Sequence, residues 1–302
     1  MSRLDRIYIT ASRHDGRYSR ICAASVRYFY PDAPVSLLPG GTLEPGLAEE
    51  MARYWNIGLA AVEERDWGWG FVKLEPLFGP AGERFMVLDS DTAFGGLVLS
   101  AWEDSAADFL VDDEQQDEAD TRRLYYDWRE VAKFDPEARA PAFVFNSGQW
   151  FGTSGVLSRA DFEPWVNWDA PKPALRHADC FMPGDQGVLN YVLNQKAALQ
   201  GLAVDRKQIM RWPGHGMSDF SAAAVRARTA PARVIHWAGM KKPRLGAMTG
   251  ADLLRFFESY YYSRTPGGSA RRRLAGLGYP LETWRRGLSE RARLRLGRIV
   301  GS

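Results

Sequence analysis

The chain has 302 residues, of which 45% are hydrophobic and 25% charged, so it is large enough for one sizeable domain or two small ones. A formal net charge of +2 gives no reason to expect nucleic acid as a partner. The only cysteines, Cys22 and Cys180, do not make a disulfide scaffold, which favours a reducing, cytoplasmic environment. A charged N-terminus and the lack of any apolar run of about 18 residues predict neither a secretory signal nor a membrane-spanning helix.

Strands and helices alternate through the first 90 residues. Short apolar strands are expected at 7–10, 35–38, 57–62 and 84–88. A loop at 12–19 precedes the first helix, and helices are expected at 21–30, 47–54 and 71–78. Continuous apolar strands between helices indicate an α/β fold, an open Rossmann-like sheet flanked by helices. In such a sheet, ligands bind at the carboxyl ends of the strands.

The second half of the chain continues this alternation less regularly. The stretch 103–120 holds nine acidic residues in eighteen and is expected to be a solvated loop. After it we expect a strand at 142–145, helices at 162–168 and 185–194, and a strand at 233–237. The acidic stretch and three tryptophans, Trp150, Trp165 and Trp168, are candidates for lining an acceptor pocket.

The composition changes again near the C-terminus. From residue 264 on, the chain has ten arginines against two glutamates, with apolar residues at mixed steps of three and four. We divide the chain into a main domain, 1–250, and a helical, Arg-rich C-terminal segment, 251–302. A basic amphipathic tail can lie peripherally on the inner face of an anionic membrane. A solvated terminus is the alternative.

Two carboxylates, Asp89 and Asp91, follow the apolar strand in FMVLDSDTAF. Residues i and i+2 of an extended backbone point the same way, so both side chains face one point beyond the strand end. Like charges at such a point need a counter-charge. A hard cation, Mn²⁺ or Mg²⁺, supplies it and suits oxygen ligands.

A phosphatase of the haloacid dehalogenase class is one alternative, because it also ends an apolar strand with Asp-x-Asp. That class has Thr or Val two residues after the second Asp, where this chain has Ala93, and its pair lies near the start of the chain. Its later Gly-Asp-x-x-x-Asp motif is half met by Gly184 and Asp185. A nucleotidyltransferase and a non-catalytic sugar-binding protein also stay open.

Four motifs in order, KLEPLFGPAGERFMVLDSD, FNSGQWFGTSGVL, GDQGVLNYVL and HWAGMKKP, resemble the retaining glycosyltransferases of family 8, the group of glycogenin and bacterial lipopolysaccharide glycosyltransferases. The resemblance covers about residues 5–245 and implies a GT-A-type open mixed sheet. It also implies a metal-dependent transfer of a hexose from a UDP-sugar, UDP-glucose or UDP-galactose, to a hydroxyl of a glycan or lipid-linked acceptor.

The resemblance assigns roles by position. The implied metal ligands are Asp89, Asp91 and His236. The implied catalytic residues are Asp185, Gln186 and Lys242. The implied donor-binding residues are Thr10, Ser12, Lys73, Ser90, Asn146, Ser147, Gly148 and Gly239. This chain departs from the family at Gly187 and Arg244 and lacks the usual Asp near Thr10, which leaves the nucleotide less defined. No carboxylate nucleophile is evident, so the resemblance implies retention by same-face attack.

Overall fold

The computed structural model describes residues 4–214, 216–241 and 244–276. The strands of its main sheet are, in chain order, β1 (Arg6–Ala11), β2 (Val35–Pro39), β3 (Gly58–Leu59), β4 (Arg84–Leu88), β6 (Phe109–Asp112), β7 (Gln149–Thr153) and β10 (Val204–Lys207). They lie in the order β10-β6-β7-β4-β1-β2-β3. Strand β7 runs antiparallel to β4 and β6, whereas the other neighbours are parallel. The open mixed sheet expected from the sequence is confirmed.

Two smaller sheets accompany the main one. The first holds β5 (Thr92–Phe94), β11 (Met210–Arg211) and β12 (Val234–His236) in the order β11-β12-β5. The second is the pair β8 (Val166–Asn167) and β9 (Ala174–Leu175). The first of these sheets matters for the site, because β5 begins one residue after Asp91 and β12 ends at His236.

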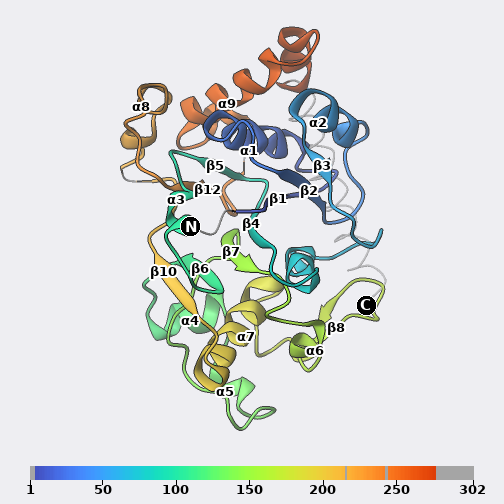
Figure 1. The fold of residues 1–302 in the computed structure, drawn as a ribbon, viewed down its shortest axis with the longest axis vertical. Coiled ribbons are helices and arrows are strands. Elements are labelled where there is room, and N and C mark those ends of the chain that lie inside the picture. Colours follow the sequence, from blue (N-terminus) through green and yellow to red (C-terminus); the bar gives the residue numbers. More distant parts are fainter. Residues whose placement is uncertain (1–3, 215, 242–243, 277–302) are drawn as a thin grey trace, which may run out of the picture.

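Helices cover the main sheet on both sides (Figure 1). The α-helices are α1 (Gly16–Phe29), α2 (Leu47–Trp55), α3 (Ser100–Glu103), α4 (Glu118–Leu124), α5 (Trp128–Val131), α6 (Arg159–Phe162), α7 (Asp185–Gln200), α8 (Ala222–Ala227) and α9 (Ala251–Ser263). The 3₁₀ helices are η1 (Phe71–Phe78), η2 (Met217–Phe220) and η3 (Leu245–Ala247). Within the described residues, none of these helices combines the length and apolar character needed to cross a bilayer.

The main sheet lies between two hydrophobic cores, and successive side chains of β4 point alternately into one core and the other. Met86 and Leu88 pack into the core that contains α1 and α9, while Phe85 and Val87 pack into the core that contains α7. Successive side chains of a strand point to opposite faces, so a strand buried on both faces reads as a continuous apolar run. This pattern explains why the RFMVL run predicted β4 correctly.

Several expected elements need correction. Helix α1 begins at Gly16 instead of residue 21, so only the first part of the expected loop is a loop. The expected helix at 162–168 is wrong, because α6 ends at Phe162 and Pro164 has no N–H with which to continue it. The expected strand at 57–62 is reduced to β3. The acidic stretch 103–120 is not only a solvated loop, because it contains the buried strand β6.

The expected strand at 142–145 is also wrong, for a reason that lies in α7. Asn190 of α7 accepts a hydrogen bond from the backbone N–H of Phe145 and donates one to its carbonyl, both at 2.9 Å. Asn194 bonds the backbone of Ala142 and Phe143 in the same way. Two amide side chains therefore replace the neighbouring strand that a ladder would need.

The basic segment after α9 packs in part against the main domain. Arg264 lies over the ring of Trp55, and Arg272 forms an ion pair with Glu258 at 3.1 Å. Arg271 is paired with a glutamate of α2. The segment 264–272 is therefore not a free solvated terminus. Residues 277–302, which carry most of the expected amphipathic tail, lie outside the described residues, and the division after residue 250 stays a prediction.

We expect Asn190→Ala to lower the free energy of unfolding by about 2–4 kcal/mol, because it leaves buried backbone groups of Phe145 unpaired. Denaturant unfolding measures this change. Gln200→Ala, at the exposed end of the same helix, is the control and should stay within about 0.5 kcal/mol of the wild type. Equal effects of the two substitutions would show that the amide ladder does not stabilise the fold.

Candidate active site

Strand register brings the predicted metal ligands together. Ile9 of β1 pairs with Leu88 of β4, and Leu88 pairs with Gln149 of β7. The residues next to these, Thr10, Asp89 and Gly148, therefore meet at the carboxyl end of β4. The N–H of Asp89 donates to the carbonyl of Gly148 at 2.7 Å. In the second sheet, His236 pairs with Thr92, which places His236 beside Asp91.

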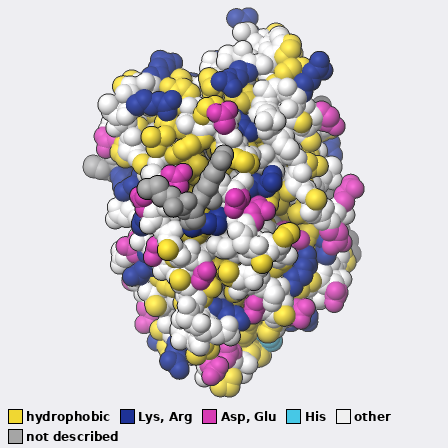
Figure 2. Space-filling view, in the orientation of Figure 1, with side chains coloured by type: hydrophobic (Ala, Val, Ile, Leu, Met, Phe, Trp, Pro, Cys, Tyr) yellow, Lys and Arg dark blue, Asp and Glu magenta, His cyan; other side chains and the backbone are white. Residues whose placement is uncertain are grey.

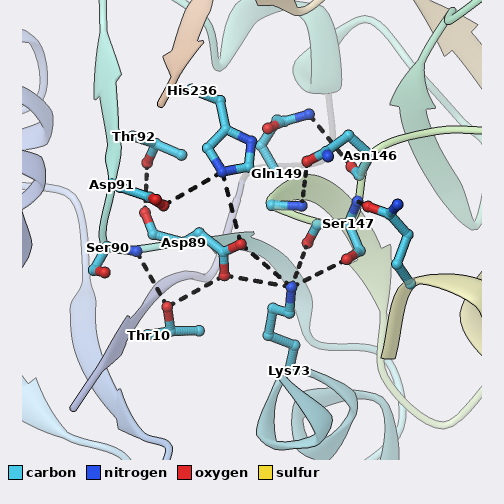
Figure 3. Close-up of polar contacts among 12 residues, drawn as sticks. Thr10, Lys73, Asp89, Ser90, Asp91, Thr92, Asn146, Ser147, Gln149 and His236 are labelled. Carbon is cyan, nitrogen blue, oxygen red and sulfur yellow. Dashed lines mark hydrogen bonds and ion pairs between the residues drawn. The ribbon is translucent and has the colours of Figure 1, made fainter. Parts of the chain in front are cut away.

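Figure 3 shows the resulting group of Asp89, Asp91 and His236. His236 Nε2 lies 3.3 Å from Asp91 Oδ1 and 3.8 Å from Asp89 Oδ2. One nitrogen or oxygen atom from each residue fits within 4.8 Å of the others, the spacing of a group that can hold a metal ion. Asp91 and His236 are buried, whereas Asp89 keeps 27% of its side chain exposed. The group is therefore reachable from solvent through Asp89.

The imidazole of His236 is held in place by packing. Both ring nitrogens are buried; Nε2 faces the carboxylates of Asp91 and Asp89 without hydrogen-bond geometry, and Nδ1 has no hydrogen-bond partner within the described part of the chain. Buried polar atoms of this kind usually have a partner, so the ring is suited to bind a metal ion through one of its nitrogens. A Cβ atom at Gly148 would lie 2.1 Å from His236 Cε1, so only glycine leaves room for the ring.

Lys73 of η1 is the buried cation of the site. Its Nζ lies 3.0 Å from Asp185 Oδ2, 3.4 Å from Asp89, 3.0 Å from Ser147 Oγ and 3.2 Å from the carbonyl of Ser147. Burial alone would lower the pKa of Lys73, but attraction to Asp185 and Asp89 outweighs burial and raises it. The ammonium therefore connects the start of α7 to the end of β4.

Lys241 is a second cation at the site, which the sequence motif did not single out. Its Nζ lies 3.0 Å from Asp15 Oδ1 and 3.4 Å from Asp91 Oδ2. In the described residues, the carboxylates Asp15, Asp89, Asp91 and Asp185 thus face the two ammonium groups of Lys73 and Lys241. This arrangement leaves two formal negative charges, the charge that a divalent cation balances.

The pKa values of two of these carboxyls shift in opposite directions. Burial raises the pKa of Asp185 to about 6, against the attraction of Lys73. Burial also acts to raise the pKa of Asp91, but contact with His236 and with Lys241 holds that pKa below its usual range. Asp91 is therefore ionised at neutral pH, as a metal ligand has to be.

Three more of the residues expected from the sequence lie around this centre, namely Thr10, Ser90 and Gln186. Thr10 Oγ1 lies 3.3 Å from Asp89 Oδ1 and accepts from the N–H of Ser90 at 3.2 Å. Gln186 is fixed at both ends of its amide, because it accepts from the N–H of Ser147 and donates to the carbonyl of Leu124.

Three other expected residues, Asn146, Ser12 and Gly239, lie in loops between the strands and helices. Asn146 caps its own turn by accepting from the N–H of Gly148 at 2.8 Å. Ser12 donates to Asp15 Oδ2 at 2.7 Å, so it lies on the side of Lys241 and not against Asp89. Gly239 adopts a positive φ of 67° in the turn after β12. The prediction for Lys242 lies outside the described residues.

The site includes contacts that motif reading did not predict. Gly70 precedes η1, and a Cβ atom there would lie 2.0 Å from Asp185 Oδ1. Trp212, just after β11, stacks on His236 with ring centroids 5.5 Å apart and planes inclined by 17°. The DWGWG stretch offered a signal for the first, since paired glycines mark close approaches. Nothing local to the sequence predicted the second, because it depends on the register of β11 and β12.

Comparison with known proteins identifies the fold. No protein-family model matches the sequence, and no curated protein matches it significantly. Solved structures do match, and they have the GT-A glycosyltransferase fold with its large open mixed sheet. A complex of the galactosyltransferase LgtC with donor and acceptor sugar analogues gives a TM-score of 0.58 at 15% identity, over 86% of this chain and 96% of LgtC.

The bifunctional glycosyltransferase WbbM gives a TM-score of 0.54 at 12% identity, over 89% of this chain and 51% of WbbM. GlyE of Streptococcus pneumoniae TIGR4, without ligand, gives 0.50 at 11% identity, over 93% and 64%. LgtC and WbbM are glycosyltransferases of the family 8 type, so the resemblance read from the four motifs is confirmed. At these identities, the comparison establishes the fold of the chain.

We expect Gly148→Ala to weaken Mn²⁺ binding by roughly 10–100-fold although all three candidate ligands remain, because the added methyl group displaces the ring of His236. Calorimetric titration of the protein with Mn²⁺ measures the affinity. Gly58→Ala is the matched control, since the nearest atom to its new methyl group is Ser36 Oγ at 3.8 Å. Unchanged Mn²⁺ affinity in Gly148→Ala, with the fold intact, would exclude His236 as a ligand.

Proposed function

We propose that the chain is a metal-dependent glycosyltransferase that moves a hexose from a nucleotide sugar, UDP-glucose or UDP-galactose, to a hydroxyl group of an acceptor. The observation that carries the proposal is the group of Asp89, Asp91 and His236 at the carboxyl end of β4. The match to nearly the full length of LgtC, which was solved with donor and acceptor sugar analogues, supports it.

Asp89, Asp91 and His236 would hold the cation, Mn²⁺ or Mg²⁺, since two carboxylates and one imidazole suit either ion. The fit rests on the imidazole of His236, whose buried Nε2 faces the carboxylates of Asp91 and Asp89 without hydrogen-bonding to them, and on the excess of negative charge around it. When bound, the cation supplies positive charge against the diphosphate of the donor.

Lys73 and Lys241 would act on the same diphosphate from two different elements of the fold. Lys73 reaches Asp89 from η1, and Lys241 reaches Asp91 from the turn after β12. Ammonium groups fixed in advance stabilise charge that develops on a leaving group, and they do so more strongly in a buried site. We assign Lys242 to the same role.

Asp185 and Gln186 would position the donor sugar at the start of α7. Lys73 fixes the carboxylate of Asp185, and the backbone of Ser147 and Leu124 fixes the amide of Gln186. The turn Asn146–Ser147–Gly148 would line the sugar pocket, and Thr10, Ser12 and Ser90 would lie on the nucleotide side.

The reaction breaks the bond between the anomeric carbon and the diphosphate oxygen and forms a bond from that carbon to the acceptor oxygen. The proton of the acceptor hydroxyl passes to the leaving diphosphate. We propose that the acceptor attacks on the face from which the diphosphate leaves, so that the configuration is retained. Asp185 then shields the positively charged carbon without a covalent bond to it.

Incubation with Mn²⁺ and a panel of nucleotide sugars tests the function. We expect release of free UDP from UDP-glucose or UDP-galactose, and a rate lowered by roughly 100-fold or more in Asp91→Asn. Asp104→Asn, an exposed carboxylate at the end of α3, is the control and should leave the rate unchanged.

Other outcomes would contradict the proposal. Phosphate release from phosphomonoesters would indicate the phosphatase, and pyrophosphate release would indicate a nucleotidyltransferase. Donor binding with neither hydrolysis nor transfer would indicate a sugar-binding protein. If no nucleotide sugar binds and Asp91→Asn has no effect, the proposal that the chain is a glycosyltransferase is refuted.

We also propose that the basic tail brings the enzyme to the inner face of an anionic membrane, where a lipid-linked or envelope glycan is the acceptor. Figure 2 shows basic side chains at the upper end of the molecule, where α1 and α9 lie, as well as elsewhere on this face. Deleting residues 277–302 keeps the ion pairs of Arg271 and Arg272 with the main domain.

This deletion should reduce sedimentation with anionic vesicles while UDP binding stays the same. Vesicles of neutral lipid are the control, and neither the full chain nor the shortened one should sediment with them. Equal sedimentation of both chains with anionic vesicles would show that the tail does not bring the protein to the membrane.

A further inference from the structure

A pocket of about 370 Å³ lies at the end of the molecule where α1, α2 and α9 are found (Figure 1). In the described residues, its charged lining consists of four arginines and one glutamate: Arg13, Arg17, Arg20, Arg271 and Glu44. Small-molecule sites have volumes of about 300–1,000 Å³, so the pocket has room for a small organic anion. The tryptophans that the sequence offered for an acceptor pocket do not border it, because they are buried in the core: Trp150, Trp165 and Trp168.

The glutamates around this pocket are shared between arginines. Glu44 accepts hydrogen bonds from Arg20 through both of its carboxylate oxygens, at 2.8 and 3.0 Å. Glu50 pairs with Arg20 at 2.9 Å and also with Arg271. Every nitrogen of the Arg20 guanidinium therefore donates within the protein, while Arg271 shares its glutamate with Arg20.

Positive charge is in excess as a result. Glu258 pairs with Arg17 at 2.7 Å and with Arg272 at 3.1 Å. Four arginines thus face three glutamates, and Arg13 adds a guanidinium that forms no ion pair within the described part of the chain. Five guanidinium groups and three carboxylates leave two formal positive charges at the pocket.

Glu44 shows that part of the lining already holds an anion. A Cβ atom at Gly16, the first residue of α1, would lie 1.9 Å from Glu44 Oε2, so the carboxylate rests on the start of the helix. Helix N-termini and guanidinium forks both attract carboxylates and phosphates. The side chain of Glu44 is 37% exposed, and Arg13 is exposed as well, so the lining is reachable from solvent.

The pocket and the metal group lie on different faces of α1. Gly16 and Arg20, four residues apart, line the pocket together. Tyr18 and Cys22, also four residues apart, lie on the opposite face of the helix. Cys22 Sγ lies 3.4 Å from Thr92 Oγ1, and Lys241 Nζ lies 5.8 Å from the centre of the Tyr18 ring. That second face is the one turned toward the metal group, so a donor diphosphate there leaves the pocket free.

We propose that this pocket is a second anion site, which binds a phosphomonoester. A phosphomonoester carries a charge of about −1.5 to −2 at neutral pH, close to the excess positive charge of the pocket. Guanidinium forks also match phosphate oxygens in geometry. Tyr262, Leu274 and Ala275 complete the lining and would contact the carbon atoms next to the phosphate. The inference goes beyond the proposed function and does not depend on it.

Two ligands with the same phosphate group distinguish a soluble source from a lipid. Calorimetric titration of the full chain with glycerol 3-phosphate tests the soluble source. Sedimentation with vesicles of phosphatidic acid tests the lipid headgroup, against vesicles of phosphatidylglycerol, a phosphodiester, at equal surface charge. We expect binding of glycerol 3-phosphate or a preference for phosphatidic acid, in either case unchanged by UDP and Mn²⁺.

Charge variants test whether the binding takes place in the pocket. Arg13→Gln and Arg271→Gln should each weaken it roughly tenfold, because each removes a guanidinium donor. In Arg271→Gln, Glu50 keeps its hydrogen bonds from Arg20 and Tyr261, so the surroundings stay paired. Glu44→Gln should strengthen the binding, because it removes a competing negative charge.

Arg53→Gln is the control. Arg53 is exposed on α2 and does not line the pocket, and its substitution changes the net charge by the same amount. It should bind glycerol 3-phosphate and vesicles as the wild type does.

Four results would overturn the inference. The wild type binds neither glycerol 3-phosphate nor phosphatidic acid in preference to phosphatidylglycerol. Arg53→Gln weakens the binding as much as Arg13→Gln does. Glu44→Gln weakens the binding. UDP with Mn²⁺ abolishes the binding, which would place the phosphate in the donor site.

Discussion

Repulsion between carboxylates at the carboxyl end of β4 is the constraint on which the site depends. Asp89, Asp91 and Asp185 converge there, and like charges in a partly buried place cannot all stay ionised without compensation. Lys73 compensates part of this charge from within the core, and Lys241 compensates part from the surface. The negative charge that remains suits a divalent cation, and the bound cation would in turn attract a diphosphate.

The fold keeps this unfavourable arrangement in place because each residue is fixed by strand register. The parallel pairing of β1 with β4 sets Thr10 beside Asp89, and the antiparallel pairing of β7 brings Gly148 to the same point. In the second sheet, the antiparallel pairing of β5 with β12 places His236 beside Asp91. A site assembled from three such pairings needs the whole mixed sheet, and for this reason its residues lie scattered over more than half of the chain.

Local sequence patterns predicted the elements whose apolar residues are continuous and failed where a long-range contact decides the backbone. Strands β1, β2 and β4 and helix α7 follow from their own residues. The stretch at 142–145 reads as a strand, but Asn190 and Asn194 hold it as an irregular segment. Motif order predicted Asp89, Asp91 and His236 as neighbours, whereas Lys241 and Trp212 depend on how loops meet and were not foreseeable.

The central claim is that the carboxylate group binds a cation and the donor diphosphate together. If so, the two ligands are coupled, and each must raise the affinity for the other by the same factor. Calorimetric titration of UDP into the wild-type protein, in Mn²⁺ and again in a chelator, measures that coupling directly. The account predicts tight UDP binding in Mn²⁺ and at least about tenfold weaker binding in the chelator. Equal affinity in the two buffers would contradict it.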